Sequence, residues 1–217
     1  MNITEKAKKI ADSCRFCWMC RHVCPVGNAT GQERNTARAR ALAVSLVSRG
    51  AEKIDEIIDN VYECTLCGAC TNNCVTGWDP KVFIQEVKTD AALNGVIPAY
   101  VNDMLDKYEK TGNVYGESVK EEIKVLLNKE KTDILFFAGS DAIYKSPESV
   151  ITAANLLKKA GVKFTIDGKV IDSGNAMWFL TGKTEETLTA AKNAAAEMNG
   201  YKTVIVYDPV DLKLIRH

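Results

Sequence analysis

The apolar positions in the first half of the chain recur with the period of amphipathic helices. The stretch GQERNTARARALAVSLVSRG carries apolar residues at helical spacing and ends at Gly50, and the shorter AEKIDEIIDNVYE leads directly into Cys64. With Asp79 as N-cap and Pro80 as the first helical residue, KVFIQEVKTDAALNG is predicted to form a helix. A further helix is predicted after Pro98, in AYVNDMLDKYEK. The first half is therefore expected to be mostly helical.

From Thr132 onward, short apolar runs alternate with helical segments. The runs DILFFAG, VKFTIDG and KTVIVYD have the length of strands. Ser146 and Pro147 are predicted to start the helix ESVITAANLLKKAG, and an alanine-rich helix is predicted from Thr184 to Gly200. Strands that alternate with helices pair in parallel through right-handed crossovers, so we expect a small α/β domain with about three or four parallel strands.

Composition and charge exclude several classes of protein. A chain of 217 residues is long enough to bury a hydrophobic core without disulfide bonds, and its 28 basic residues equal its 28 acidic residues. This balance provides no overall field for binding nucleic acid or an anionic membrane. The N-terminal segment is charged, and no apolar run approaches the roughly 18 residues that span a bilayer. We expect a cytoplasmic protein without a transmembrane segment.

All eight cysteines lie between Cys14 and Cys74, in two runs with the same spacing. The first run reads CRFCWMCRHVCP and the second reads CTLCGACTNNCV, so the spacing that starts at Cys14 is repeated from Cys64. In a reducing compartment, clustered cysteines are better explained as metal ligands or redox groups than as a disulfide framework. The repeat therefore predicts a duplicated set of ligands.

Three cysteines spaced as C-x2-C-x2-C lie on one tight loop, and their thiolates can converge on three iron corners of a single cubane. In paired-cluster ferredoxins, the fourth cysteine of each run binds the other cluster. On this pattern we predict two [4Fe-4S] clusters with interleaved ligands. Cys14, Cys17, Cys20 and Cys74 would bind the first cluster, and Cys64, Cys67, Cys70 and Cys24 the second. In such ferredoxins a proline often follows the fourth cysteine. Pro25 fits this pattern in the first run, whereas Val75 stands at the equivalent position of the second run.

Zinc is the main alternative, because it also binds four cysteines. Structural zinc sites usually take two C-x2-C pairs separated by a longer loop, so a third cysteine in each run would be surplus. A catalytic or disulfide-forming cysteine is a weaker alternative, since two sites of four ligands use all eight cysteines. We favour two [4Fe-4S] clusters.

The segment around the first cysteine run holds six arginines and one acidic residue, Glu33. A cubane bound by four thiolates is anionic, and nearby guanidinium groups stabilise the added electron and donate hydrogen bonds to sulfur. Arg15 and Arg21 lie inside the run and are the best candidates for this role. Phe16 and Trp18 are expected to shield the cluster from water. Three further arginines, Arg34, Arg38 and Arg40, are interpreted as a solvated helix face in preference to the alternative, a docking patch for an acidic partner.

The two cysteine runs, the helical spacer and the following α/β region resemble the iron-sulfur subunits of the heterodisulfide reductase, glycolate oxidase and anaerobic glycerol-3-phosphate dehydrogenase group. The resemblance implies an α-helical ferredoxin domain, similar to that of the succinate dehydrogenase iron-sulfur subunit, at residues 1–112. It further implies a linker helix at 113–131 and a CCG-type α/β domain at 132–217. The chain stops where the family's second half-domain would begin, so we expect a shortened subunit or a partner that supplies the remainder.

The family's cysteine-rich segments have lost their cysteines in this chain. FFAGSDAIY has Ser140 where the family has cysteine, DSGNA has Asp172 and Ser173, and YDPVDLK has Asp208 and Asp211. Serine and aspartate do not supply the soft thiolates that a further iron-sulfur centre needs. The resemblance therefore implies a degenerate domain that neither binds this centre nor reduces disulfides.

The resemblance implies a non-catalytic electron-transfer subunit of an oxidoreductase complex in anaerobic metabolism. Electrons would pass singly through two [4Fe-4S] clusters, between a flavoprotein and another redox centre. The expected partners are an FAD-dependent hydroxyacid dehydrogenase or an electron-transfer flavoprotein, and a further iron-sulfur subunit. No G-x-G-x-x-G follows a predicted strand, so FAD is expected on the partner and not on this chain. The alternative function is an iron-sulfur sensor or interaction protein without an electron relay.

Overall fold

The computed structural model describes residues 3–127, 131–168 and 171–216. The chain divides into two compact units. The N-terminal unit consists of residues 1–102 with 179–183, and the C-terminal unit consists of residues 103–178 with 184–217. Each unit is described separately below.

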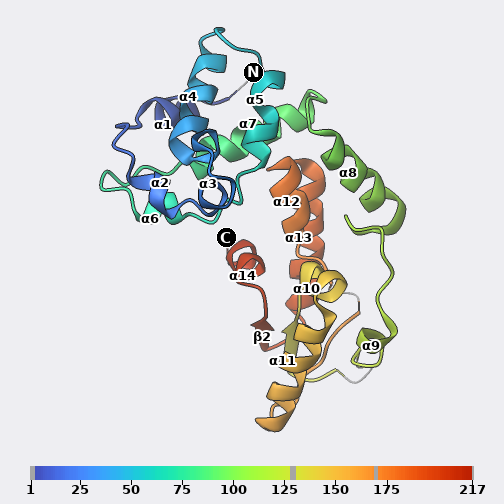
Figure 1. Ribbon diagram of the computed structural model, residues 1–217. Coiled ribbons are helices and arrows are strands. Elements are labelled where there is room, and N and C mark those ends of the chain that lie inside the picture. Colours follow the sequence, from blue (N-terminus) through green and yellow to red (C-terminus); the bar gives the residue numbers. More distant parts are fainter. Residues whose placement is uncertain (1–2, 128–130, 169–170, 217) are drawn as a thin grey trace. The chain divides into compact units, whose positions relative to one another are not determined.

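The N-terminal unit is helical in its described residues. Its elements are α1 (Glu5–Asp12), α2 (Met19–Val23), α3 (Pro25–Thr30), the 3-10 turn η1 (Glu33–Asn35), α4 (Ala37–Ser48), α5 (Ile54–Tyr62), α6 (Ala69–Asn72), α7 (Lys81–Leu93) and the start of α8 (Ala99–Thr111). Helices α1, α4, α5 and α7 pack against one another (Figure 1). Their core contains Val44, Val61 and Phe83, each without exposed surface. The predicted helical character of this half is confirmed.

Local signals set the helix starts. Thr36 caps α4 by accepting a hydrogen bond from the Ala39 amide at 3.4 Å. Asp79 Oδ1 accepts from the Lys81 amide at 3.1 Å, and α7 begins at Lys81. The predicted start of this helix, with Pro80 as its first residue, is therefore displaced by one position.

The C-terminal unit combines helices with a small sheet. Its elements are the rest of α8, α9 (Glu121–Lys124), β1 (Ile134–Phe137), α10 (Ser140–Lys145), α11 (Pro147–Lys159), the start of α12 (Asn175–Thr181), α13 (Glu185–Met198), β2 (Thr203–Val206) and α14 (Pro209–Ile215). Strands β1 and β2 pair in parallel, with Ile134 opposite Thr203. In the segment predicted to be a linker helix, the described part contains α9, and residues 128–130 lie outside the described residues.

Strand β1 is buried on both faces, because helices pack against each of them. Phe136 packs in one core cluster with residues of α10 and α11, such as Ile143 and Val150. Leu135 and Phe137 point to the other face, where they pack with Met198 of α13. This two-sided burial explains why the sequence of β1 is a continuous apolar run instead of an alternating one.

The predicted strand VKFTIDG does not extend the sheet. Thr165 forms one isolated bridge with β1, in which its amide donates to Ile134 O and its carbonyl accepts from the Phe136 amide, both at 2.8 Å. A strand needs several consecutive pairs, and this bridge is isolated among the described residues. The sheet therefore has two strands in the described part of the chain, and the expectation of three or four is wrong.

No helix among the described residues is long and apolar enough to cross a membrane.

Candidate iron-sulfur centres

The two cysteine loops have the same unusual backbone conformation. Phe16 and Trp18 have φ angles of 55° and 67°, and the equivalent residues Leu66 and Gly68 have φ angles of 54° and 78°. A non-glycine residue in the left-handed region costs about 1–2 kcal/mol, and such strain is typical of ligand-binding loops. Backbones of this type gather their N–H groups into a concavity that favours anions, including iron-sulfur clusters.

The short helices after these loops lie against each other. Helix α2 packs on α6, and the Asn73 side-chain amide donates to Met19 O at 2.8 Å. Helix α2 leads from the third to the fourth cysteine of the first run, and α6 does the same for the second run. Because the two helices are adjacent, the fourth cysteine of each run lies next to the other loop.

The eight cysteines are divided between two cavities. Cavity A is lined by Cys14, Cys17, Cys20 and Cys74. Cavity B is lined by Cys64, Cys67, Cys70 and Cys24. Each cavity thus combines the first three cysteines of one run with the fourth cysteine of the other, which is the grouping that the sequence predicts. Ligation by these residues stays a prediction.

The donor chemistry fits iron-sulfur clusters. Four thiols per cavity supply the soft ligands that such clusters take. All eight cysteines are free thiols in the structure. Among the described residues, no group of three or more Cys, His, Asp or Glu side chains is arranged to hold a metal ion. A cubane does not need such convergence, because each of its four thiolate ligands binds a different iron atom.

The thiols of each cavity affect one another's ionisation. Burial, followed by repulsion from the Cys64 thiolate, raises the pKa of Cys70 to about 11. Burial also raises the pKa of Cys20, with smaller contributions from Cys14 and Cys17. Clustered thiols of this kind lose their protons when a cationic centre binds them, so binding is coupled to proton release.

The two fourth cysteines have different surroundings. Cys24 is the N-cap of α3, and its Sγ accepts from the Gly27 amide at 3.4 Å and donates to Asn35 O at 3.2 Å. Pro25 is the first residue of α3. Burial acts to raise the pKa of Cys74, but hydrogen bonds from Thr76 and the following backbone amides give it a net lowered pKa.

Arg15 and Arg38 line cavity A, whereas Arg21 stacks on Trp18 with its guanidinium carbon 5.6 Å from the ring centroid. Arg38 lies over Trp18 at 3.8 Å and forms an ion pair with Glu33. A binding role for Arg15 and Arg21 stays a prediction.

The interpretation of Arg34, Arg38 and Arg40 as a solvated helix face is wrong for two of the three. Arg40 is 1% exposed and lines cavity B, and the Arg38 side chain is 20% exposed. Arg34 fits the interpretation, with a side chain that is 60% exposed. The alternation of basic and small residues in TARARA did not distinguish buried from solvated positions, because burial depends on helices that pack from elsewhere in the chain.

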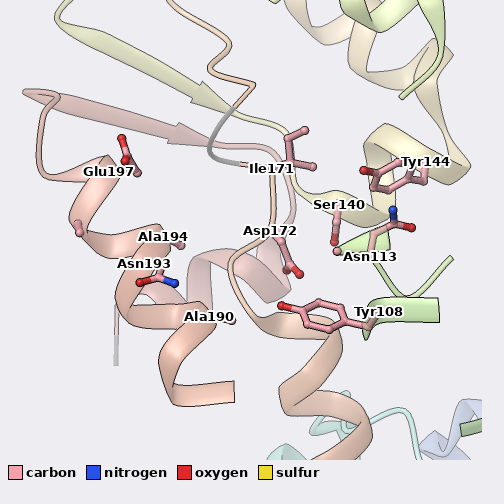
Figure 2. Close-up of a pocket in the computed structure, with 12 residues that line it drawn as sticks. Tyr108, Asn113, Ser140, Tyr144, Ile171, Asp172, Ala190, Asn193, Ala194 and Glu197 are labelled. Atoms are coloured by element: carbon pink, nitrogen blue, oxygen red, sulfur yellow. The ribbon is translucent and has the colours of Figure 1, made fainter. Parts of the chain in front are cut away.

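In the C-terminal unit, two of the positions where the resemblance leads us to expect cysteine line the same cavity. Ser140 and Asp172 line one cavity of about 460 Å³. Figure 2 shows the Asp172 carboxyl group and the Tyr108 hydroxyl directed toward each other, with Ser140 above them. Ala190 and Asn193 of α13 lie to their left in this view. Burial raises the pKa of Asp172, and the Asp141 carboxylate raises it further.

Of the other three substituted positions, Asp208 caps α14, and Ser173 and Asp211 are hydrogen-bonded to each other. The Ser173 hydroxyl donates to Asp211 Oδ1 at 2.5 Å, and Asp211 is 4% exposed. Burial raises the pKa of Asp211 to about 7, although the bond from Ser173 acts in the opposite direction. These hard oxygen donors bond to each other or line a polar cavity, and they offer no thiolate.

Comparison with known proteins identifies the cysteine-bearing region. Residues 10–78 match the family described as a 4Fe-4S dicluster domain. The curated relatives include one subunit of the dihydromethanophenazine:CoB–CoM heterodisulfide reductase from Methanosarcina mazei, which is 25% identical over 194 residues. The corresponding subunits from Methanosarcina acetivorans and Methanosarcina barkeri are 24% and 23% identical.

Each of these alignments covers 77% of this chain and 46% of the relative, so the aligned region spans about half the length of the relatives. No solved structure matches the chain significantly. The resemblance to iron-sulfur subunits of the heterodisulfide reductase group is confirmed.

Proposed function

We propose that this chain is an electron-transfer subunit that binds two [4Fe-4S] clusters and relays electrons singly between a flavoprotein and another redox centre. The main support for this proposal is the division of the eight cysteines between two cavities, each with three cysteines of one run and the fourth of the other. The match to a 4Fe-4S dicluster domain supports the identity of the bound groups.

Several groups of the chain would serve the bound clusters. The thiolates of cavities A and B would hold the iron, and the backbone N–H groups of the left-handed loops would be available to the anionic sulfur atoms. Trp18 and Met19 line cavity A and limit the access of water. A [4Fe-4S] cluster supplies one-electron chemistry when bound, so a chain that holds two of them would let the two electrons of a flavin hydroquinone leave one after the other. The two protons of the hydroquinone remain with the flavoprotein or pass to solvent.

Substrate chemistry is assigned to partners in this proposal. The relatives' name links dihydromethanophenazine to a CoB–CoM heterodisulfide. In this chain, Ser140, Asp172, Ser173 and Asp211 supply no thiolate, which argues against disulfide reduction by the chain itself. We assign FAD to a flavoprotein partner, the terminal acceptor to a further redox subunit and the complex to the cytoplasm.

Anaerobic purification tests the proposal. The protein should contain about eight irons and eight acid-labile sulfides per chain, with a visible absorption band that dithionite bleaches. Rapid reversible bleaching by a reduced electron-transfer flavoprotein supports the relay. Zinc in place of iron would exclude the proposal. Clusters that the flavoprotein does not reduce, but whose loss alters binding to a partner, would support a sensor instead.

A further inference from the structure

Arg40 is a buried cation whose side chain is held in place on two sides. It is 1% exposed, on α4. Its Nε donates to Asn60 O at 2.7 Å, and its Nη1 donates to Asn35 O. These two carbonyls fix the plane of the guanidinium group.

The third nitrogen of Arg40 has no bonding partner in the described part of the chain. Nη2 is buried and makes no hydrogen bond there. Leaving one donor of a charged group without an acceptor in the interior is unfavourable, so native structures usually provide a partner. Arg40 lines cavity B together with its four cysteines. An anionic sulfur atom in this cavity would be the missing acceptor.

Asn35 links Arg40 directly to one of these cysteines. The Asn35 carbonyl accepts hydrogen bonds both from Arg40 Nη1 and from Cys24 Sγ, the latter at 3.2 Å. When Cys24 ionises to bind iron, its thiol proton is lost and the carbonyl keeps its bond to Arg40. The guanidinium group is therefore positioned beside a ligand whether or not iron is bound.

Lys88 places a second buried cation in the same region. It has no exposed surface, and its Nζ donates to Phe179 O at 3.0 Å and lies 4.9 Å from the centroid of the Tyr62 ring. Burial lowers the pKa of Lys88 to about 8, and the charges of Cys64 and Arg40 make smaller contributions of opposite sign. On α7, Lys88 lies about one helical turn after Ile84, which lines cavity B.

The basic residues at cavity A are exposed or ion-paired. Arg15, which lines the cavity, and Arg21, which stacks on Trp18, are both exposed to solvent. Arg38 is ion-paired with Glu33 and stacked on Trp18, and its side chain is partly exposed. Lys81, which also lines cavity B, pairs with Asp79 at 3.5 Å. By contrast, the hydrogen bonds that Arg40 and Lys88 donate within the described residues go to backbone carbonyls, which carry no net charge. Cavity B therefore has the larger buried positive charge, because Arg40 and Lys88 are shielded from solvent and Arg15 and Arg21 are not.

We propose that Arg40 donates through Nη2 to a sulfur atom of the cluster in cavity B and, with Lys88, makes that cluster the higher-potential member of the pair. The inference rests on the proposed function. Reduction adds one negative charge to the cluster, and a buried donor cation stabilises the reduced form more than the oxidised form. Electrons that enter through cavity A would therefore collect at cavity B.

A redox titration followed by electron paramagnetic resonance tests the inference on the whole chain with both clusters. The variant Cys67→Ser identifies which signal belongs to cavity B. We expect Arg40→Gln to decrease the equilibrium constant for reduction of that cluster at least tenfold. For one electron, this change lowers the midpoint potential by about 59 mV. Lys88→Met should shift the same signal in the same direction.

Two further variants complete the test. Arg38→Gln removes an arginine that lines cavity A, and it should leave the cavity B potential unchanged. Arg40→Lys keeps the positive charge but lacks the planar set of N–H donors, so it should lower the potential by less than Arg40→Gln does. If the Arg40→Gln protein does not bind its clusters, Arg40→Lys is measured in its place. Unchanged potentials in Arg40→Lys and Lys88→Met, or equal shifts at both clusters, overturn the inference. A wild-type chain without two cubanes would overturn the proposed function instead.

Discussion

The guanidinium carbon of Arg38 lies 3.8 Å from the centroid of the Trp18 ring. Trp18 has a left-handed backbone and is 41% exposed, and both residues line cavity A. The ion pair with Glu33 keeps the guanidinium group over the ring. This stack forms part of the wall between cavity A and solvent, so it should control how readily oxygen reaches a cluster there.

Trp18→Gly should make the cavity A cluster more sensitive to air. Glycine is the residue at the equivalent position 68 of the other loop, where it also has a positive φ, so the backbone should be retained. Loss of the indole opens the wall, and we expect absorbance of the cluster to decay severalfold faster in air. Tyr100→Ala, at an exposed residue outside the described lining of either cavity, is the control. Equal decay rates in both variants would show that Trp18 does not shield the cluster.

Cys24→Ser should damage the cluster of cavity B and spare the cluster held by its own sequence neighbours. Cys24 lines cavity B with Cys64, Cys67 and Cys70. Serine is a hard donor and a poor substitute for a thiolate. Iron content should fall toward about half, and the remaining resonance signal should be that of cavity A.

Cys74→Ser is the matched variant, because Cys74 lines cavity A. It should spare the signal that Cys24→Ser removes. If each variant instead destroys the cluster of its own run, the ligand sets are not interleaved.

Asp211 should make the stability of the C-terminal unit depend on pH. Its pKa in the folded chain is about 7, above the ordinary value of 3.8. The folded state therefore holds an extra proton between roughly pH 4 and 7, and stability should fall as pH rises through this window, by at most about 1.4 kcal/mol per pH unit. Urea unfolding at several pH values measures the slope.

Asp211→Asn should remove this contribution, because the amide cannot titrate. The variant should lose less stability than the wild type between roughly pH 5 and 7. Asp133→Asn, with a side chain that is 69% exposed, is the control and should keep the wild-type slope. An unchanged slope in Asp211→Asn would assign the pH dependence to other groups.

Gly139→Ala should destabilise the C-terminal unit strongly. Gly139 has a φ of 84°, and a Cβ atom there would lie 2.2 Å from Asp211 Oδ2. Gly139 has a ψ of 151°, a combination with positive φ that is essentially restricted to glycine. This backbone strain and the overpacking against a buried carboxyl group should together cost about 2–6 kcal/mol.

Gly161→Ala provides the comparison, since Gly161 has a φ of 76° but no atom of the described residues within 4 Å of its Cβ position. It should cost only the backbone strain, about 1–2 kcal/mol. Urea unfolding of both variants separates strain from crowding. Similar losses would mean that Asp211 moves aside without cost.

The long helices could be predicted from the sequence because their signals are local. Helices α7, α11 and α13 have apolar residues at helical spacing and residues typical of helix starts, such as Pro147 and Thr184. The third predicted strand has equally good local signals, but Thr165 reaches β1 through a single bridge. Whether an apolar run joins a sheet depends on partners far away in the chain, and local pattern does not contain them.

The sequence by itself determined the chemistry of the candidate site: eight thiols, two runs with one spacing, and no cysteine in the region after Cys74. Those features are fixed by residue type and by short separations along the chain. Only the tertiary structure decided which arginine is buried, because Arg40 is held by carbonyls of Asn35 and Asn60, the second of which lies twenty residues away. It likewise brought Ser173 to Asp211 across 38 residues. Burial and long-range contact arise from packing between helices, and a periodic pattern records only which face is apolar.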